Sequence, residues 1–197
     1  MKWSDPTAAN TVPRPDILLH PNIPKPIHGV APRIIMGKEW WDVERKKAYK
    51  STNYHCAACG VSQSEAEYHT WLEAHELYEI DYARGRMVFV ELVPLCHSCH
   101  NFIHSGRMEM LVQSGEMDGK KQRDILRHGE AVIKAAGLKK PEPPSKCAAW
   151  GDWRLVFNGR EYPLKHRSFE AWASFYGHGD EDDFFSAFEQ DFYGDDD

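Results

Sequence analysis

Two Cys-x-x-Cys pairs are the most specific chemical feature of the sequence. They are formed by Cys56, Cys59, Cys96 and Cys99. Two such pairs can place four thiolates in a tetrahedron around a zinc ion, and four protein ligands leave no open position for a substrate. The alternative is a set of four free buried cysteines, which seldom occurs at this spacing. The sequence therefore predicts a structural zinc ion.

Two histidines, His100 and His104, follow the second cysteine pair directly. They are four residues apart at the start of an expected helix, so both side chains project from one face. They can serve as two ligands of a second, harder metal ion. Alternatively, His100 packs beside the zinc and His104 is solvated, and the spacing alone does not separate the two interpretations. Three further histidines lie near the cysteine pairs, but the four cysteines already complete the zinc site: His55, His69 and His97.

His75 lies in the stretch WLEAHELYEI, between the two cysteine pairs. It could be a catalytic base, a metal ligand or a packed core residue, and a lone histidine in a strand is usually the last. A hairpin and a helix closed by zinc would bring His75 close to His100 and His104. A neutral imidazole there could take a proton from water while a metal binds a phosphate oxygen. The convergence of three histidines favours this catalytic interpretation.

The elements that must position these residues have clear local patterns. Residues 70–95 alternate like two strands around the turn ARGR, which predicts a β-hairpin. The stretch CHSCHNFIHSG predicts a zinc-binding turn that opens a short helix ending near Gly106. Other expected elements are a helix over 38–50, a helix over 119–137 with Gly137 as its C-terminal cap, a hairpin turn at Asn158-Gly159 and a helix capped by Ser168.

Residues 54–106 resemble the HNH endonuclease family and its zinc-stabilised ββα-metal fold. The resemblance rests on the first cysteine pair, the histidine near the end of the first strand and the stretch LVPLCHSCHNFIH. This segment is similar to a divergent phage and bacterial HNH-like subgroup. By this resemblance His75 matches the general base, His100 matches a metal ligand, and His104 matches a ligand used in some branches. The implied reaction is hydrolysis of DNA phosphodiester bonds with Mg²⁺ or another divalent ion.

The sequence departs from the family pattern at two positions. The family commonly has an Asp or His metal ligand immediately before the base, where this chain has Ala74. The position of the family's Asn, which orients the loop that bears the base, is occupied by Glu91. Glu73 lies on the same strand face as His75 by period-two alternation and can replace the missing ligand as a catalytic residue. Glu76 is the other nearby carboxylate.

Together these patterns predict an α+β protein with a small HNH-like core and several appendages. Seven of the twelve prolines lie in the first 33 residues, which indicates an extended arm. The predicted segments are an arm over 1–37, a zinc-bound domain with flanking helices over 38–138, a linker over 139–146, a hairpin and helix over 147–179, and an acidic aromatic tail over 180–197.

Charge is unevenly distributed along the chain. Residues 180–197 hold nine of the 30 acidic residues and none of the 24 basic ones, so the preceding residues carry a small positive balance. No apolar signal core or run long enough to span a membrane is present. Paired cysteines without such a signal favour a reducing cytoplasm, that of the host cell if a phage encodes the protein.

Two functions remain open from the sequence. A nuclease would contact DNA phosphates through basic residues: Arg45, Lys46, Lys47, Arg84, Arg86 and Arg107. The alternative is a catalytically inactive HNH-like zinc scaffold that binds protein or DNA. Its acidic tail could then mimic DNA as an inhibitor, or the tail or the proline-rich arm could bind a protein partner. No coiled-coil or other interface pattern defines an oligomeric state.

Overall fold

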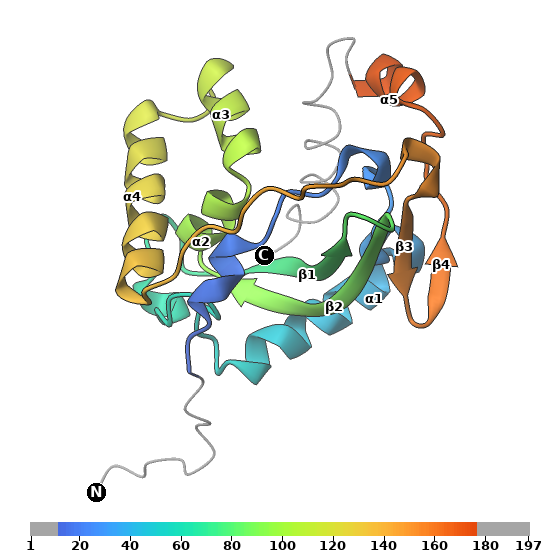
Figure 1. The fold of residues 1–197 in the computed structure, drawn as a ribbon. Helices are drawn as coiled ribbons and strands as arrows, with labels where there is room; N and C mark the ends of the chain where they lie inside the picture. Colours follow the sequence, from blue (N-terminus) through green and yellow to red (C-terminus); the bar gives the residue numbers. More distant parts are fainter. Residues whose placement is uncertain (1–11, 177–197) are drawn as a thin grey trace, which may run out of the picture. The chain divides into compact units, whose positions relative to one another are not determined.

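The computed structural model describes residues 12–176, which form an α+β fold. In this part of the chain a four-stranded sheet has the order β1-β2-β3-β4 and is accompanied by five α-helices (Figure 1). No helix among these residues combines the length and apolar character needed to cross a membrane. The expected tail over 180–197 and the first residues of the arm lie outside the described residues.

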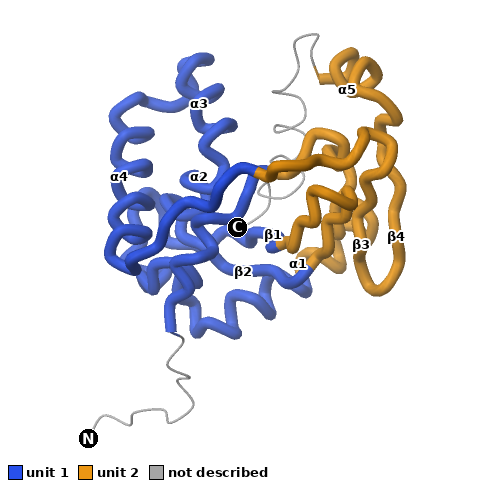
Figure 2. The backbone as a smooth tube through the Cα atoms, in the orientation of Figure 1, with its two compact units in different colours: residues 1–22, 43–77, 90–143 blue, residues 23–42, 78–89, 144–197 orange. Residues whose placement is uncertain are grey.

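The chain divides into two compact units, each built from three separate segments (Figure 2). Unit 1 contains residues 1–22, 43–77 and 90–143, and unit 2 contains residues 23–42, 78–89 and 144–197. All three predicted histidines and the four paired cysteines belong to unit 1.

The predicted hairpin is confirmed by β1 (Glu73–Asp81) and β2 (Arg86–Leu95). Gly85 closes the turn between the strands with a φ of 64°, a left-handed conformation that disfavours residues with a side chain. A Cβ at this position would also lie 3.1 Å from the carbonyl oxygen of Asp152. Local turn chemistry therefore sets the point at which the chain reverses.

Three helices and a short 3₁₀ segment pack together in unit 1. They are α2 (His97–Ile103), α3 (Ser105–Gln113), α4 (Gly119–Ala135) and η1 (Pro15–Leu19). Helix α2 packs against both α4 and η1, and Ile17 and Leu18 of η1 are buried in the shared core. A Cβ on Gly129 would lie 2.2 Å from Phe102 Cδ2, so the closeness of α2 and α4 requires glycine there. The N-terminal arm therefore contributes core residues as well as extended chain.

The helix that follows the second cysteine pair differs from its prediction. It ends at Ile103 rather than near Gly106, and α3 begins at Ser105, so Gly106 lies inside a helix. Helix α2 ends because His104 leaves helical geometry, with a φ of −89° and a ψ of 42°. The cost of about 1 kcal/mol for one glycine is too small to prevent α3 from including Gly106. The longer predicted helix is confirmed as α4, with Gly137 in the left-handed region at a φ of 67°.

The helix expected over 38–50 belongs to a longer element, α1 (Pro32–Ser51). The backbone of α1 leaves helical geometry at Gly37, where φ is 80° and ψ is 176°. The glycine separates a short first turn from the longer helix that the sequence predicts.

Unit 2 contains the strands β3 (Arg154–Phe157) and β4 (Arg160–Tyr162) and helix α5 (Phe169–Tyr176). Strand β3 runs parallel to β2, and β4 runs antiparallel to β3. The predicted Asn158-Gly159 turn is confirmed, since both residues have a left-handed φ. Ser168 Oγ accepts a hydrogen bond from the backbone N–H of Ala171, which confirms the predicted helix cap.

Candidate metal centre

Four cysteine sulfurs converge in unit 1, at the start of α2. The Sγ atoms of Cys56, Cys59, Cys96 and Cys99 all lie within 4.8 Å of one another, and the Cys59–Cys96 pair is 3.8 Å apart. Cys96 caps α2 and Cys99 lies in its first turns. The first pair sits on a tight turn in which the Gly60 N–H donates to the Cys56 carbonyl at 2.9 Å. The group could hold a metal ion.

The four thiols lie close enough to shift the pKa of one another in opposite directions. Hydrogen bonding with Cys56 lowers the pKa of Cys59 and raises the pKa of Cys99. Four thiolates this close repel one another strongly unless a cation lies between them. The donor set is the one that tetrahedral structural metal sites use.

His128 of α4 lies beside the cysteine cluster. Its Nε2 is 3.4 Å from the Cys99 sulfur, and a hydrogen bond with Cys59 raises the pKa of His128 despite partial burial. The sequence does not predict this contact, because His128 lies 29 residues after Cys99 and no motif joins the two. A ring N–H directed at sulfur would stabilise a thiolate ligand from outside the coordination shell.

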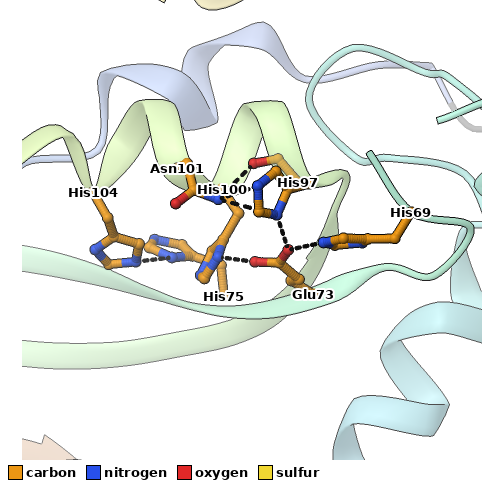
Figure 3. Close-up of polar contacts among 7 residues, drawn as sticks. All are labelled: His69, Glu73, His75, His97, His100, Asn101 and His104. Atoms are coloured by element: carbon orange, nitrogen blue, oxygen red, sulfur yellow. Dashed lines mark hydrogen bonds and ion pairs between the residues drawn. The ribbon is translucent and has the colours of Figure 1, made fainter. Parts of the chain in front are cut away.

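The structure brings His75, His100 and His104 together as a second cluster (Figure 3). His75 projects from β1, His100 lies in α2, and His104 follows the last residue of α2. One ring nitrogen from each residue lies within 4.8 Å of the others, so this group could also hold a metal ion. The hairpin and the helix thus bring His75 close to His100 and His104, as the sequence pattern predicts.

His75 is the most buried member of this cluster, with 5 % of its surface exposed. Its Nδ1 lies 3.2 Å from Nε2 of His104, and its Nε2 lies 3.4 Å from Nδ1 of His20. His20 follows η1 in the proline-rich arm, and sequence analysis did not single it out. No spacing rule could have found it, because 55 residues separate it from His75.

Glu73 lies two residues before His75 on β1, and its carboxylate contacts histidines on both sides (Figure 3). Oε2 forms an ion pair with His100 Nδ1, and Oε1 lies 2.8 Å from His97 Nδ1. Burial alone would raise the pKa of Glu73. The attraction of His100 and the hydrogen bonds from His100 and His97 outweigh that effect and hold this pKa below its usual range. Glu73 therefore carries a buried negative charge.

A third group consists of His69, Glu73 and His97, which could also hold a metal ion. His69 Nε2 lies 3.4 Å from Glu73 Oε1, and burial lowers the pKa of His69. The sequence pattern gives neither histidine a role, since the cysteines complete the first site. The signal that could have found them is the alternation that aims Glu73 at the helix carrying His97.

The two positions that depart from the HNH pattern have distinct surroundings. Ala74 is buried and offers no ligand atom. Glu91 forms an ion pair with Arg14, with Nη1 and Oε1 2.6 Å apart. Glu76 is buried, but among residues 12–176 it belongs to none of the three groups. Glu73 belongs to one of these groups, and its carboxylate contacts His97 and His100.

Several basic residues expected to meet DNA already have acidic neighbours. Lys47 pairs with Glu44 at 2.6 Å, Arg84 with Asp81 at 2.9 Å, and Arg86 with Glu161 at 3.5 Å. These pairs are solvent-exposed, so each contributes little to stability and can be exchanged for a phosphate contact.

Comparisons of the chain with protein-family models, with curated proteins and with solved structures find no match.

Proposed function

We propose that the protein is a metal-dependent endonuclease of HNH type, which hydrolyses DNA phosphodiester bonds and is held together by a structural zinc ion. The observation that supports this most is the convergence of His75, His100 and His104 on a hairpin and helix next to a four-cysteine cluster. This arrangement places a potential base and two potential metal ligands within one small substructure.

In this proposal His100 and His104 hold a divalent ion, and Glu73 orients His100 through its Nδ1. When bound, the ion polarises a phosphate oxygen and stabilises the charge of the leaving group. Imidazole nitrogen favours zinc, nickel and similar ions, whereas magnesium prefers oxygen ligands. We therefore expect Co²⁺ or Ni²⁺ to support activity better than Mg²⁺.

His75 is the proposed general base. The water oxygen forms a bond to phosphorus, its proton moves to a nitrogen of His75, and the bond to the leaving sugar oxygen breaks. The leaving oxygen then takes a proton from solvent. Nδ1 of His20 lies 3.4 Å from Nε2 of His75. His20 can accept the Nε2 proton, which would return His75 to its neutral form.

The test is nicking of supercoiled plasmid by the full chain with each metal in turn. His75→Ala should abolish nicking while the protein keeps its circular dichroism spectrum and its zinc. His55→Ala is the matched control, because His55 contacts the Asn53 carbonyl and belongs to none of the three groups. Nicking by His75→Ala at the wild-type rate would exclude His75 as the base.

A non-catalytic binding module is the second candidate. It is favoured by the burial of His75, whose two ring nitrogens both face other histidines, and by Ala74 in place of a ligand. In that case plasmid stays intact with every metal, while DNA or a protein partner still binds the zinc-loaded chain.

A further inference from the structure

We propose that His69, Glu73 and His97 form an additional divalent-cation site that shares the Glu73 carboxylate with the His75 cluster. The site is distinct from the four-cysteine cluster and from the His75, His100 and His104 group. The proposal concerns metal binding alone and does not depend on nuclease activity.

The distances around Glu73 Oε1 match a set of metal ligands. Oε1 lies 2.8 Å from His97 Nδ1 and 3.4 Å from His69 Nε2. A tetrahedral zinc ion with bonds of about 2.1 Å holds its ligand atoms about 3.4 Å apart. The distance from Oε1 to His97 Nδ1 is about 0.6 Å shorter than this and must lengthen to admit the ion.

Contacts around the two histidines hold their rings in place. The ring of His69 stacks on Trp71, with centroids 3.8 Å apart and an interplanar angle of 5°. The ring of His97 lies edge-on to the ring of Tyr68, with centroids 5.3 Å apart, and the buried Asn101 donates from Nδ2 to the His97 carbonyl oxygen at 3.0 Å (Figure 3). Such surrounding contacts fix the orientation of metal-binding imidazoles and increase metal affinity.

Two histidines and one glutamate are the ligand set of zinc sites that keep a fourth position open for water or a substrate. The side chains of His69 and His97 are 16 % and 14 % exposed, so solvent reaches the edge of the group. The chemistry favours Zn²⁺, Co²⁺ or Ni²⁺ over Mg²⁺ because two of the three ligands are nitrogen.

The shared carboxylate connects the two histidine clusters. Oε1 faces His97 and His69, whereas Oε2 contacts Nδ1 of His100. Glu73 would thus be a direct ligand of one ion and would orient a ligand of the other. Binding at the two sites is therefore expected to be coupled through a single side chain.

The alternative is that Glu73 is only the acceptor of a buried hydrogen-bond network with the surrounding histidines. A network of that kind needs no cation, and truncation of His69 would then change stability without changing metal content.

The experiment measures bound zinc per full-length chain after equilibrium dialysis, by elemental analysis, together with the Kd of each site by calorimetry. His69→Ala should lose one equivalent, and His69→Cys, which restores a ligand atom, should regain it. His55→Ala is the matched control and should bind as the wild type does. Unchanged stoichiometry and Kd in His69→Ala would overturn the proposal, as would loss in His69→Ala without recovery in His69→Cys.

A further variant separates this proposal from the proposed nuclease. His104→Ala alters the His75 cluster but none of the three ligands of the additional site. It should abolish nicking and remove the metal of the His75 cluster, while the equivalent lost in His69→Ala remains. If no plasmid is nicked at all but His69→Ala still loses one equivalent, the nuclease fails and the additional site stands.

Discussion

The Glu73 carboxylate and the His100 imidazole are in direct contact inside the protein, from Oε2 to Nδ1. This contact leaves Nε2 of His100 for the His75 cluster and fixes the orientation of the ring. A carboxylate that orients a metal-binding histidine also increases the basicity of that ligand. Glu73 therefore orients His100 and increases its basicity, although Glu73 is not itself a ligand in the His75 cluster.

Replacement of Glu73 by Gln should weaken metal binding by the His75 cluster. The expected loss is about 10–100-fold in affinity, because an amide cannot supply the negative charge that polarises His100. Calorimetric titration of the zinc-loaded chain with Co²⁺, in a His69→Ala background that lacks the proposed additional site, measures this effect. Glu76→Gln is the control, since Glu76 is similarly buried on the same strand but belongs to none of the three groups. Equal losses in both variants would show that the effect is not specific to Glu73.

Removal of the metal from the cysteine cluster should unfold the core of unit 1. Structural zinc sites contribute about 10–16 kcal/mol of apparent binding free energy, more than the usual stability of a domain. Thermal unfolding followed by circular dichroism should lose its cooperative transition on chelation or in Cys99→Ser. Cys147→Ser is the matched control, since Cys147 is exposed and outside the cluster. A cooperative transition in the metal-free chain would contradict a structural role.

The features that sequence analysis predicts well depend on neighbouring residues. The Asn158-Gly159 turn needs left-handed backbone at both positions, which these two residue types adopt most readily. The spacing of the cysteine pairs likewise predicts a tetrahedral metal site without knowledge of the fold. The expected stop at Gly106 is not where the helix ends, since α2 stops at Ile103 and α3 includes Gly106 at the small helix cost of one glycine.

The features that escape prediction depend on chain segments far apart in sequence. His20 reaches His75 only because η1 is buried against α2 and α4, and nothing in the arm's composition specifies that docking. The position of Glu73 relative to His75 follows from alternation, but its contact with His97 depends on the placement of α2 beside β1. Propensity and spacing do not encode such tertiary placement.

The contact between Gly129 and Phe102 predicts opposite effects of alanine in two helices. Gly129→Ala should destabilise the protein by about 1–3 kcal/mol, because its Cβ would overlap Phe102, whose ring fills the space between α2 and α4. Gly106→Ala should be neutral or stabilising by up to about 1 kcal/mol, since nothing lies within 4 Å of its Cβ inside α3. Urea unfolding of the two variants measures the difference. Similar free energies of unfolding would contradict the close packing of α2 on α4.

Acid should weaken the packing of α5 in unit 2 through His28. The Trp172 indole N–H donates to His28 Nδ1 at 3.3 Å, and His28 Nε2 donates to the Ile23 carbonyl at 3.1 Å, which together require a neutral ring. Burial lowers the pKa of His28 below its ordinary value of 6.5. The Ile23 hydrogen bond opposes this shift, whereas the electrostatic effects of Lys25 and His166 add to it. The unfolded chain therefore binds the proton more readily than the folded one.

The direction in which stability changes with pH follows from this difference in pKa. The stability associated with neutral His28 is fully present above pH 6.5 and is lost as the pH falls from there toward the lower pKa of the folded state. Thermal unfolding followed by tryptophan fluorescence should show a lower Tm at pH 5.5 than at pH 7.5. His28→Gln removes the titrating group, so its Tm should change less over the same interval. An equal pH response in the variant and the wild type would assign the acid sensitivity to other histidines.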